Sequence, residues 1–380
     1  MNPNANGPIL LAAGGTGGHL FPAEALAREL IGRGRKVVLV TDRRGGTFAS
    51  LPDVAVERIR SATVMPGLVG KARTAVELAV GTLQALRLIA RLKPAAVVGF
   101  GGYPSLPTGY AARRTGVPLV LHEQNAVLGR ANRLLAPGAR RICTSFGTVA
   151  GLGEADRTKL VHTGNPVRSA IAALRDLPYP APDQDGPFRL LVTGGSQGAK
   201  VFSEVVPEAV RLLPGHLRAR LSIVQQARPE TLEAAQALYA DVGARVELAP
   251  FFADMADRLA ACHLMICRGG ASTVTELAAA GRPAILIPYP HAIADEQTAN
   301  AEQFAAAGGG WVMPQSAFTP EALAARLQAL MTLPETLSKA AAAARTFGIV
   351  DAAARLADTV VGLLPANGNH ADRAVREAAE

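Results

Sequence analysis

Four glycine-rich segments are the parts of this sequence whose residue types most directly predict chemistry. They span residues 14–18, 99–102, 194–198 and 269–270. A glycine turn between a strand and a helix exposes backbone N–H groups beside the positive end of the helix dipole, where phosphate binds well. One such turn is weak evidence, because α/β folds also use glycine turns for packing. Four of them favour a phosphorylated ligand.

The spacing of these glycines excludes two common nucleotide motifs. The dinucleotide motif G-x-G-x-x-G fails because its third glycine, counted from Gly15, falls on Leu20, and its second, counted from Gly194, falls on Ser196. Asp42 nevertheless stands after a predicted strand, as that motif requires. The sequence also lacks G-x-x-x-x-G-K-[ST], which excludes an ATPase phosphate loop.

A rival pattern does match at the third segment. Residues 194–198 read G-x-S-x-G, the turn that carries the nucleophile of α/β-hydrolases. The other members of a hydrolase triad would be Asp254 or Asp295 and His263 or His291. This alternative does not explain why the first half of the chain has a parallel loop without the serine. We therefore interpret Ser196 as a hydroxyl donor to phosphate.

No metal site is predicted. Asp183 and Asp185 have the D-x-D spacing that many glycosyltransferases use for a divalent metal, but they lie in a proline-rich segment and are interpreted as a solvated turn. The three cysteines include no C-x-x-C pair, which excludes a zinc site and a disulfide framework. Loop amides, a helix dipole and Arg168 would then balance the charge of a diphosphate.

The elements that hold the glycine segments form a unit that occurs twice. The apolar run at residues 9–13 predicts a strand. After the glycines, a pattern that places Leu26 and Leu30 on one face predicts a helix, and residues 36–40 predict a second strand. Pro22 is expected in the first turn of that helix. The same order restarts with a strand at 189–193 and a helix at 199–213. Further strands are predicted at 97–100, 119–121, 264–267 and 284–287, with a helix beginning near Thr273.

Two doubly wound α/β domains that face each other across a cleft are the architecture this repetition predicts. Residues 176–187, dense in Pro and Asp, are expected to link the halves, and residues 367–380 to form a polar, frayed tail. The length of 380 residues, with 49% apolar and 18% charged residues, suits two folded domains.

Charge is unevenly distributed along the chain. Residues 1–166 carry 21 Lys and Arg against 9 Asp and Glu, whereas the rest carries 18 against 22. A basic half suggests an anionic partner, namely nucleic acid, a phosphorylated ligand or acidic lipid, and the alternative is a solvated surface. An aromatic content of 4%, with no basic run interleaved with aromatics, disfavours nucleic acid.

Several short blocks in a fixed order resemble the MurG family, a branch of glycosyltransferase family 28. The resemblance covers about residues 9 to 360. The blocks are Gly14-Gly15-Thr16-Gly17-Gly18-His19, Gly99-Phe100-Gly101-Gly102-Tyr103, His122-Glu123-Gln124-Asn125, Gly164-Asn165-Pro166-Val167-Arg168, Gly194-Gly195-Ser196-Gln197-Gly198-Ala199, Cys267-Arg268 through Glu276, and Asp295 through Ala301.

The resemblance implies a GT-B fold and an inverting, metal-independent transfer in peptidoglycan synthesis, and through it roles in cell shape and division. The donor would be UDP-N-acetylglucosamine, and the acceptor the muramyl C4 hydroxyl of undecaprenyl-diphosphate-linked MurNAc-pentapeptide. No cofactor is expected. The implied units are an acceptor domain at 1–166, a donor domain at 167–345, a helix at 346–363 that returns to the first domain, and a tail at 364–380. Other cell-wall synthesis enzymes are expected as partners.

The resemblance also implies roles for individual residues. Donor-binding residues would be Thr16, Gly17, Gly18, Asn125, Arg168, Ser196, Phe252, Ser272, Thr273, Glu276, Glu296 and Gln297. Loops for the acceptor diphosphate would use Gly14, Gly15, Gly101, Gly102 and Tyr103. Glu276 would accept two hydrogen bonds from a ribose diol, and Arg168 would contact the nucleotide, the alternative for Arg168 being a salt bridge at the hinge.

His19 is the predicted general base, because imidazole titrates in the range that suits proton removal from a hydroxyl. Glu123 is the other candidate. The chain departs from the family at Glu296, where His or Gln is common, and this brings negative charge near a diphosphate. Two alternatives remain open: a related enzyme with a different lipid or natural-product acceptor, and a non-catalytic UDP-sugar-binding protein.

One helical stripe is wider than a buried face requires. Apolar residues recur at helical spacing from Val69 to Leu86 and are widened by Leu78, Val80 and Leu88, with basic residues on the flanks. The stripe predicts docking on anionic lipid, and the alternative is an ordinary core helix. The first residues do not resemble a signal peptide, and residues 94–112 are too rich in Gly and Pro for a membrane span. Together with the resemblance to the family, these features imply a peripheral protein on the cytoplasmic face of the inner membrane.

Overall fold

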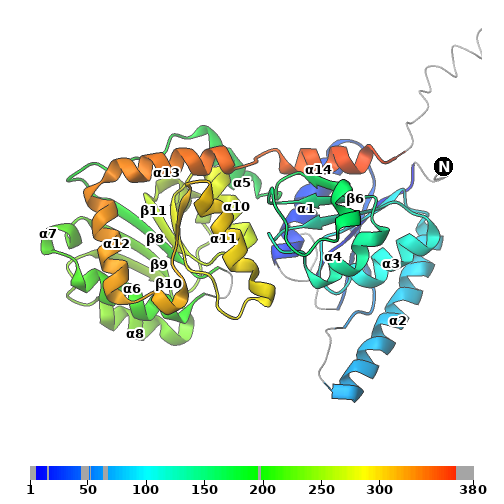
Figure 1. The fold of residues 1–380 in the computed structure, drawn as a ribbon, viewed down its shortest axis with the longest axis horizontal. Helices are drawn as coiled ribbons and strands as arrows, with labels where there is room; N and C mark the ends of the chain where they lie inside the picture. The colour runs from blue at the N-terminus through cyan, green and yellow to red at the C-terminus, as the bar shows by residue number, and fades with distance from the viewer. Residues whose placement is uncertain are drawn as a thin grey trace, which may run out of the picture.

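A computed structural model describes residues 6–14, 17–43, 51, 53–62, 67–195 and 198–364. The chain forms two lobes that lie side by side, each built on a parallel sheet with helices against it (Figure 1). The first lobe also carries one long helix that projects away from the body of the protein.

The first lobe holds a seven-stranded sheet in the order β3-β2-β1-β4-β5-β6-β7. Its strands are β1 (Ile9–Ala12), β2 (Val37–Thr41), β3 (Ala55–Arg58), β4 (Ala96–Gly99), β5 (Leu119–Glu123), β6 (Arg141–Thr144) and β7 (Leu160–His162). Its helices are α1 (Gly17–Gly32), α2 (Gly67–Leu92), α3 (Ser105–Thr115) and α4 (Arg130–Leu135). The central strands β1 and β4 are buried throughout, which is why they read as continuous apolar runs.

The second lobe holds a six-stranded sheet in the order β10-β9-β8-β11-β12-β13. Its strands are β8 (Phe188–Thr193), β9 (Leu221–Gln226), β10 (Arg245–Ala249), β11 (Leu264–Cys267), β12 (Ala284–Leu286) and β13 (Gly310–Val312). The helices that follow the first crossing are α5 (Ser169–Ala172), α6 (Lys200–Leu212), α7 (Gly215–Arg218), α8 (Pro229–Tyr239), α9 (Met255–Ala261), α10 (Ala271–Ala280), α11 (Glu296–Ala306), α12 (Pro320–Thr332), α13 (Pro334–Phe347) and α14 (Ala352–Val361).

Both sheets share one topology, and the predicted pair of doubly wound domains is confirmed. Counted from its own first strand, each sheet contains the order 3-2-1-4-5-6, to which the first lobe adds a seventh strand at the end. The strand order therefore reverses between β1 and β4 in one lobe and between β8 and β11 in the other. Ligands of doubly wound sheets bind at the carboxyl ends of the strands at this reversal. The four glycine segments follow these four strands, which places them at the two expected binding positions.

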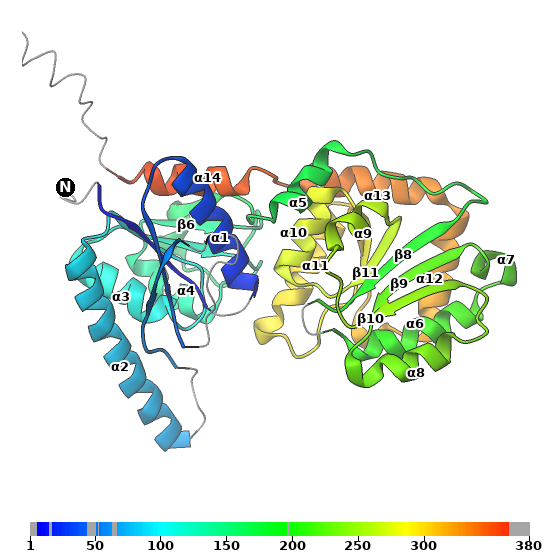
Figure 2. The ribbon, with the colours of Figure 1, turned by 180° about the vertical axis from the view of Figure 1, so that it is seen from behind.

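The chain crosses between the lobes at residues 163–168 and again at 348–351. Helix α14 then lies on the first lobe, where Leu356 and Val360 share a buried cluster with Leu26 and Leu30 of α1 (Figure 2). The predicted linker at 176–187 is wrong. Tyr179 Oη donates to the carbonyl of His263 at 2.7 Å, and Arg220 donates to two carbonyls of the segment, so it belongs to the second lobe. Pro and Asp there mark turns rather than a domain boundary.

Pro22 is also placed differently from the prediction. Helix α1 begins at Gly17, so Pro22 is its sixth residue and lies inside the helix. A proline there removes a hydrogen bond that would reach the carbonyl of Gly18, close enough to the helix start for the loss to be tolerated. Helix α10 begins at Ala271, two residues before the predicted Thr273.

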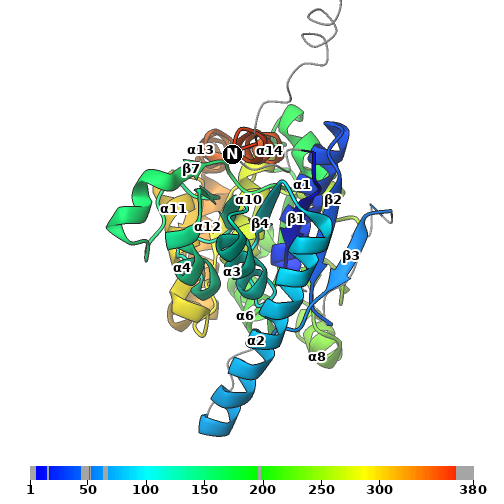
Figure 3. The same cartoon turned by 90° about the vertical axis from the view of Figure 1, so that its right-hand side faces the viewer.

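Helix α2 presents one face to the first lobe and one to solvent (Figure 3). Its buried residues are Thr74, Gly81, Ala85, Leu88 and Ile89. Leu88, which was expected in the apolar stripe, therefore belongs to the core. The stripe residues Val69, Ala72, Val76, Ala79 and Leu83 are exposed. Among the residues that the structure describes, no helix combines the length and apolar content needed to cross a bilayer.

Candidate active site

The His19 side chain lies at the strand-order reversal of the first lobe, enclosed by glycines. A carbon atom added at Gly14 would lie 3.3 Å from His19 Cδ2, and one at Gly101 would lie 3.2 Å from His19 Cε1. A carbon added at Gly102 would lie 3.4 Å from His19 Cδ2 and 3.0 Å from Gly14 Cα. Gly101 and Gly102 also have φ values of 83° and 74°, which favour glycine. These glycines, predicted as diphosphate loops, make room for an imidazole.

The imidazole of His19 is neutral at physiological pH. Its Nδ1 lies 3.1 Å from Gln124 Oε1. Burial of the ring lowers the pKa of His19 below its ordinary value, and hydrogen bonds with Gln124 and the Phe100 carbonyl oppose that shift only in part. A neutral imidazole keeps a lone pair, which a general base requires.

Glu123, the other candidate base, is occupied by its own loop. Its carboxylate accepts from the backbone N–H of Asn125 at 3.0 Å, from that of Gly129 at 2.8 Å and from Asn132 Nδ2 at 2.9 Å. Burial raises the pKa of Glu123, and these three donors act against the rise. The side chain is 2% exposed, so its geometry is that of a loop anchor rather than of a group presented to a substrate.

Helix α10 presents its first turns at the reversal of the second lobe. Ser272 and Thr273 are partly exposed in its first turn, and Glu276 follows one turn later. Glu276 is paired with Arg168, whose Nε and Nη2 donate to the two carboxylate oxygens at 2.9 Å and 3.1 Å. The guanidinium also lies 5.9 Å from the ring of Phe21 on α1, so Arg168 touches both lobes. The predicted alternative for Arg168, a salt bridge at the hinge, is present in the structure.

Helix α11 brings two further predicted residues to the same junction. Gln297 Oε1 accepts from the backbone N–H of Tyr289 at 3.0 Å. Burial raises the pKa of Glu296, and the negative charge of Glu123 raises it further. Helix α11 passes close to the glycine segment before α10, because a carbon added at Gly269 would lie 2.3 Å from the Gln297 carbonyl.

Asn300 joins the lobes and was not predicted as a site residue. Its Oδ1 accepts from the backbone N–H of Ala126 at 2.7 Å, and its Nδ2 donates to Asn125 Oδ1 at 3.0 Å and to the Gly269 carbonyl at 3.0 Å. The predicted ligand Asn125 is therefore held by the second lobe. Asn300 is fully buried, and a polar residue at a buried position of an amphipathic helix is the signal that would have identified it.

Arg268 is a second residue without a predicted role. Its guanidinium lies 5.2 Å from the Phe202 ring and 5.4 Å from the Tyr289 ring, and it donates to the carbonyls of Ile287 and Pro288. It directly precedes the glycine segment at 269–270. A cation held rigidly at this edge suits a diphosphate.

Other predicted residues are in varied surroundings. Phe252 is buried under the guanidinium of Arg258, whose Cζ lies 4.1 Å from the ring centroid, whereas the neighbouring Phe251 is 71% exposed. Tyr103 is partly exposed beside Gly102. Gly17 and Gly18 begin α1. Gly15, Thr16 and Ser196 lie outside the described residues.

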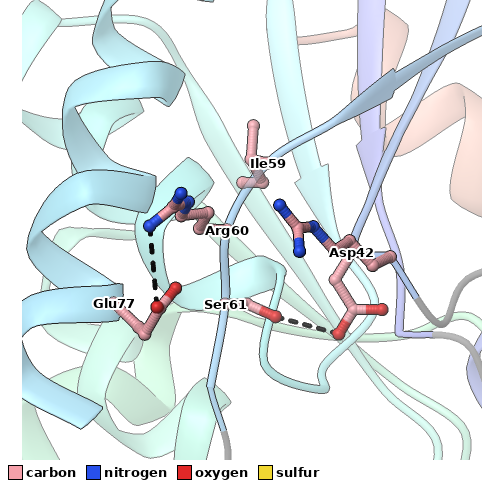
Figure 4. A pocket seen from close by; sticks show the side chains of 6 residues that line it. Asp42, Ile59, Arg60, Ser61 and Glu77 are labelled. Atoms are coloured by element: carbon pink, nitrogen blue, oxygen red, sulfur yellow. Dashed lines mark hydrogen bonds and ion pairs between the residues drawn. The ribbon is translucent and has the colours of Figure 1, made fainter. Parts of the chain in front are cut away.

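A separate pocket of about 300 Å³ opens beside β2 and β3 in the first lobe (Figure 4). Asp42 lines it and accepts from Ser61 Oγ at 2.9 Å, while Arg60 and Glu77 approach to 3.6 Å. Asp42 is thus part of a polar network within the lobe.

The hydrolase alternative loses one of its candidates. His263 precedes β11 at the amino edge of the second sheet, whereas the G-x-S-x-G segment follows β8 at the carboxyl edge, so His263 cannot join a triad there. The D-x-D residues Asp183 and Asp185 are exposed in a bend before β8.

Comparison with known proteins agrees with this geometry. A model of the glycosyltransferase family 28 N-terminal domain matches residues 9–144, and one of the C-terminal domain matches residues 189–356. The UDP-N-acetylglucosamine–N-acetylmuramyl-(pentapeptide) pyrophosphoryl-undecaprenol N-acetylglucosamine transferase of Rhodospirillum centenum is 65% identical over 356 residues, covering 93% of this chain and 94% of the relative. The relative of the same name from Rhodospirillum rubrum is 54% identical over 94% of this chain and 92% of its own length.

Solved structures give the same picture. MurG from Acinetobacter baumannii superposes with a TM-score of 0.77 at 33% identity, covering 93% of this chain and 99% of that one. The calicheamicin glycosyltransferase CalG4 superposes with a TM-score of 0.65 over 95% of this chain and 99% of that one. Because identity to CalG4 is only 16%, that likeness shows the fold alone.

Proposed function

The chain belongs to glycosyltransferase family 28, and on that premise we propose that it transfers N-acetylglucosamine from UDP-N-acetylglucosamine to the C4 hydroxyl of MurNAc in undecaprenyl-diphosphate-linked MurNAc-pentapeptide. The GT-B fold and the glycosyltransferase activity expected from the sequence are confirmed by the family match and by the likeness to MurG. The relatives at 65% and 54% identity carry this reaction in their names.

The observation that carries the mechanism is the position of the His19 imidazole, enclosed by glycines and bonded to Gln124, in surroundings that lower its pKa and so favour the neutral ring. In a single displacement, His19 takes the proton of the acceptor hydroxyl as the acceptor oxygen bonds to C1 of the donor sugar. The bond from C1 to the diphosphate oxygen breaks, its electron pair leaves with UDP, and the configuration at C1 inverts. General-base catalysis of this kind contributes about 10²- to 10⁴-fold.

We propose that the ribose and diphosphate of the donor are bound by groups of the second lobe. A carboxylate has about four lone-pair sites. The pair with Arg168 engages each oxygen of Glu276 once, so further lone pairs remain for the two ribose hydroxyls. We assign Arg168 to the positioning of Glu276. The N-terminus of α10 with Ser272 and Thr273, together with Arg268, supplies the donors and positive charge that balance the departing diphosphate without a metal.

Helix α2 is proposed to dock on the anionic membrane that holds the acceptor lipid. Leu68 is 87% exposed, Val69 84%, Val76 60% and Leu83 57%. Lys71, Arg73 and Arg87 are exposed on the same helix. An apolar stripe with basic flanks suits an interfacial helix on anionic lipid. We assign the protein to the cytoplasmic face of the inner membrane as a peripheral protein.

The test is UDP release from UDP-N-acetylglucosamine by the purified protein, with and without a short-chain acceptor lipid, in EDTA. Release that requires the acceptor and persists in EDTA is expected. Acceptor-dependent release that is lost in EDTA would keep the transferase and overturn metal independence. Tight donor binding without release under any condition would favour the binding-protein alternative.

A further inference from the structure

A chain of hydrogen bonds runs from His19 through two buried side chains to a backbone carbonyl between the lobes. Gln124 Oε1 lies 3.1 Å from His19 Nδ1, and Gln124 Nε2 lies 2.9 Å from His122 Nδ1. His122 Nε2 lies 3.1 Å from the carbonyl oxygen of Gly164. Gln124 is 3% exposed and His122 is fully buried, so water does not compete for these bonds.

Two atoms that can only accept fix the direction of every bond in this chain. The Gly164 carbonyl requires a proton on His122 Nε2, and His122 Nδ1 is then an acceptor. Gln124 Nε2 also lies 3.3 Å from the backbone carbonyl of His122, so the amide must turn its NH2 group to that side. Gln124 Oε1 therefore faces His19 as an acceptor, and His19 Nδ1 must carry the ring proton.

We propose that Gln124 is a positioning residue that holds His19 in the Nδ1–H tautomer, with the lone pair of Nε2 directed to the substrate. Gln124 is buried, and its proposed effect on the reaction is through its hydrogen bond with His19. The other tautomer would place a proton on Nε2, where it could not accept one from the acceptor hydroxyl. This inference rests on the proposed role of His19 as the base.

The far end of the hydrogen-bond chain, at Gly164, is tightly packed between the two lobes. Gly164 has a φ of 80°, and its N–H donates to the Thr144 carbonyl at 3.1 Å. A carbon added at Gly164 would lie 2.8 Å from Ile349 Cβ, in the second crossing between the lobes. Burial lowers the pKa of His122 to about 4, so this histidine stays neutral and keeps its single proton on Nε2 at physiological pH.

The test compares Gln124→Met with Gln84→Met as a matched control. Both substitutions keep side-chain length and remove an amide. Gln84, however, lies on α2, away from His19, where its side chain accepts from the backbone N–H of Arg60. With a short-chain acceptor, Gln124→Met is expected to lower kcat by about 10- to 10²-fold with little change in KM for the donor. Gln84→Met is expected to keep kcat.

Two readouts separate this role from a merely structural one. In ¹⁵N NMR of histidine-labelled protein, the proton of His19 is expected to move from Nδ1 toward Nε2 in Gln124→Met. In a His19→Ala background, Gln124→Met is expected to cause no further loss. An unchanged tautomer with unchanged kcat, or an equal loss in both backgrounds, would overturn the proposal.

An experiment on His19 itself separates a failure of its proposed role as base from a failure of the proposed role of Gln124. A loss of less than tenfold in kcat for His19→Ala would overturn the proposed base, whatever Gln124 does. Where Gln124→Met fails to fold, Gln124→Glu serves instead, since its carboxylate still accepts from Nδ1 and stabilises the cation. The acid limb of kcat/KM is then expected to shift to higher pH. An unshifted limb would refute the contact between these side chains.

Discussion

Membrane docking by α2 can be tested with Val76→Glu combined with Leu83→Glu. Both side chains are more than half exposed, at 60% and 57%, whereas Val80 in the same stripe is partly buried and would be a poorer choice. Full burial of a Val or Leu side chain is worth roughly 1.5–3 kcal/mol. Burial of the exposed share of both in lipid is therefore worth about 2 kcal/mol, a factor of about 30 in partitioning.

Charge adds to this loss. Each new carboxylate is repelled by an anionic surface and weakens membrane binding by about 1 kcal/mol. Added to the apolar term, the two substitutions together should weaken binding by about 4 kcal/mol, or about 10³-fold. The fold should be unaffected, because the buried face of α2 that includes Ala85 and Ile89 is untouched. Added salt should weaken only the electrostatic part of the interaction.

The assay is flotation with vesicles that contain phosphatidylglycerol, alongside vesicles of phosphatidylcholine alone. The matched control is Leu212→Glu with Leu333→Glu, whose side chains on the second lobe are 54% and 63% exposed. The α2 variant should lose binding to anionic vesicles and keep kcat with a short-chain acceptor, while the control should retain both. Unchanged flotation of the α2 variant, or an equal loss in the control, would refute docking through this stripe.

Three further predictions concern the site and the junction. Burial lowers the pKa of His19, and the base must be unprotonated to act. The pH profile of kcat/KM should therefore be flat at neutral pH and fall as the pH drops below 6.5, whereas a fall that begins above 6.5 would contradict this. Glu276→Gln should raise KM for UDP-N-acetylglucosamine at least about tenfold, measured against Arg168→Gln, which should have a smaller effect of the same kind. The Gly164→Ala substitution would place a side chain at a φ of 80° and a new carbon 2.8 Å from Ile349 Cβ. Thermal unfolding should therefore show a destabilisation of about 1–3 kcal/mol, and an unchanged melting temperature would contradict this strain.

The architecture was predictable because it depends on local patterns. Each central strand is a short apolar run, and each is followed by glycines and a helix, so the doubly wound units are visible in the sequence alone. The boundary between the lobes was not visible. The composition of residues 176–187 indicates turns, but only the contacts of Tyr179 and Arg220 show that the segment packs on the second lobe. Such contacts depend on residues distant in the sequence.

The candidate residues of the site could be named from the sequence, but the contacts between them could not. The sequence singled out His19, Glu123 and Asn125, and it could not show that Glu123 is enclosed by its own loop or that Asn300 holds Asn125. The glycines illustrate the reason. A glycine that cradles a phosphate and one that makes room for an imidazole have the same pattern, and only the 3.2 Å between His19 Cε1 and a carbon built on Gly101 reveals the second role.

The first crossing segment, residues 163–168, contacts both the hydrogen-bond chain of His19 and the carboxylate of Glu276. Its Gly164 carbonyl accepts from His122, which ends the hydrogen-bond chain that starts at His19. Four residues later, Arg168 pairs with Glu276 in the second lobe. Because so few residues separate these two anchors, a short length of backbone connects the proposed base to the proposed ribose-binding carboxylate. A defined separation between a proton acceptor and a bound donor is what the proposed single displacement requires, and this short connection between the two anchors suits that requirement.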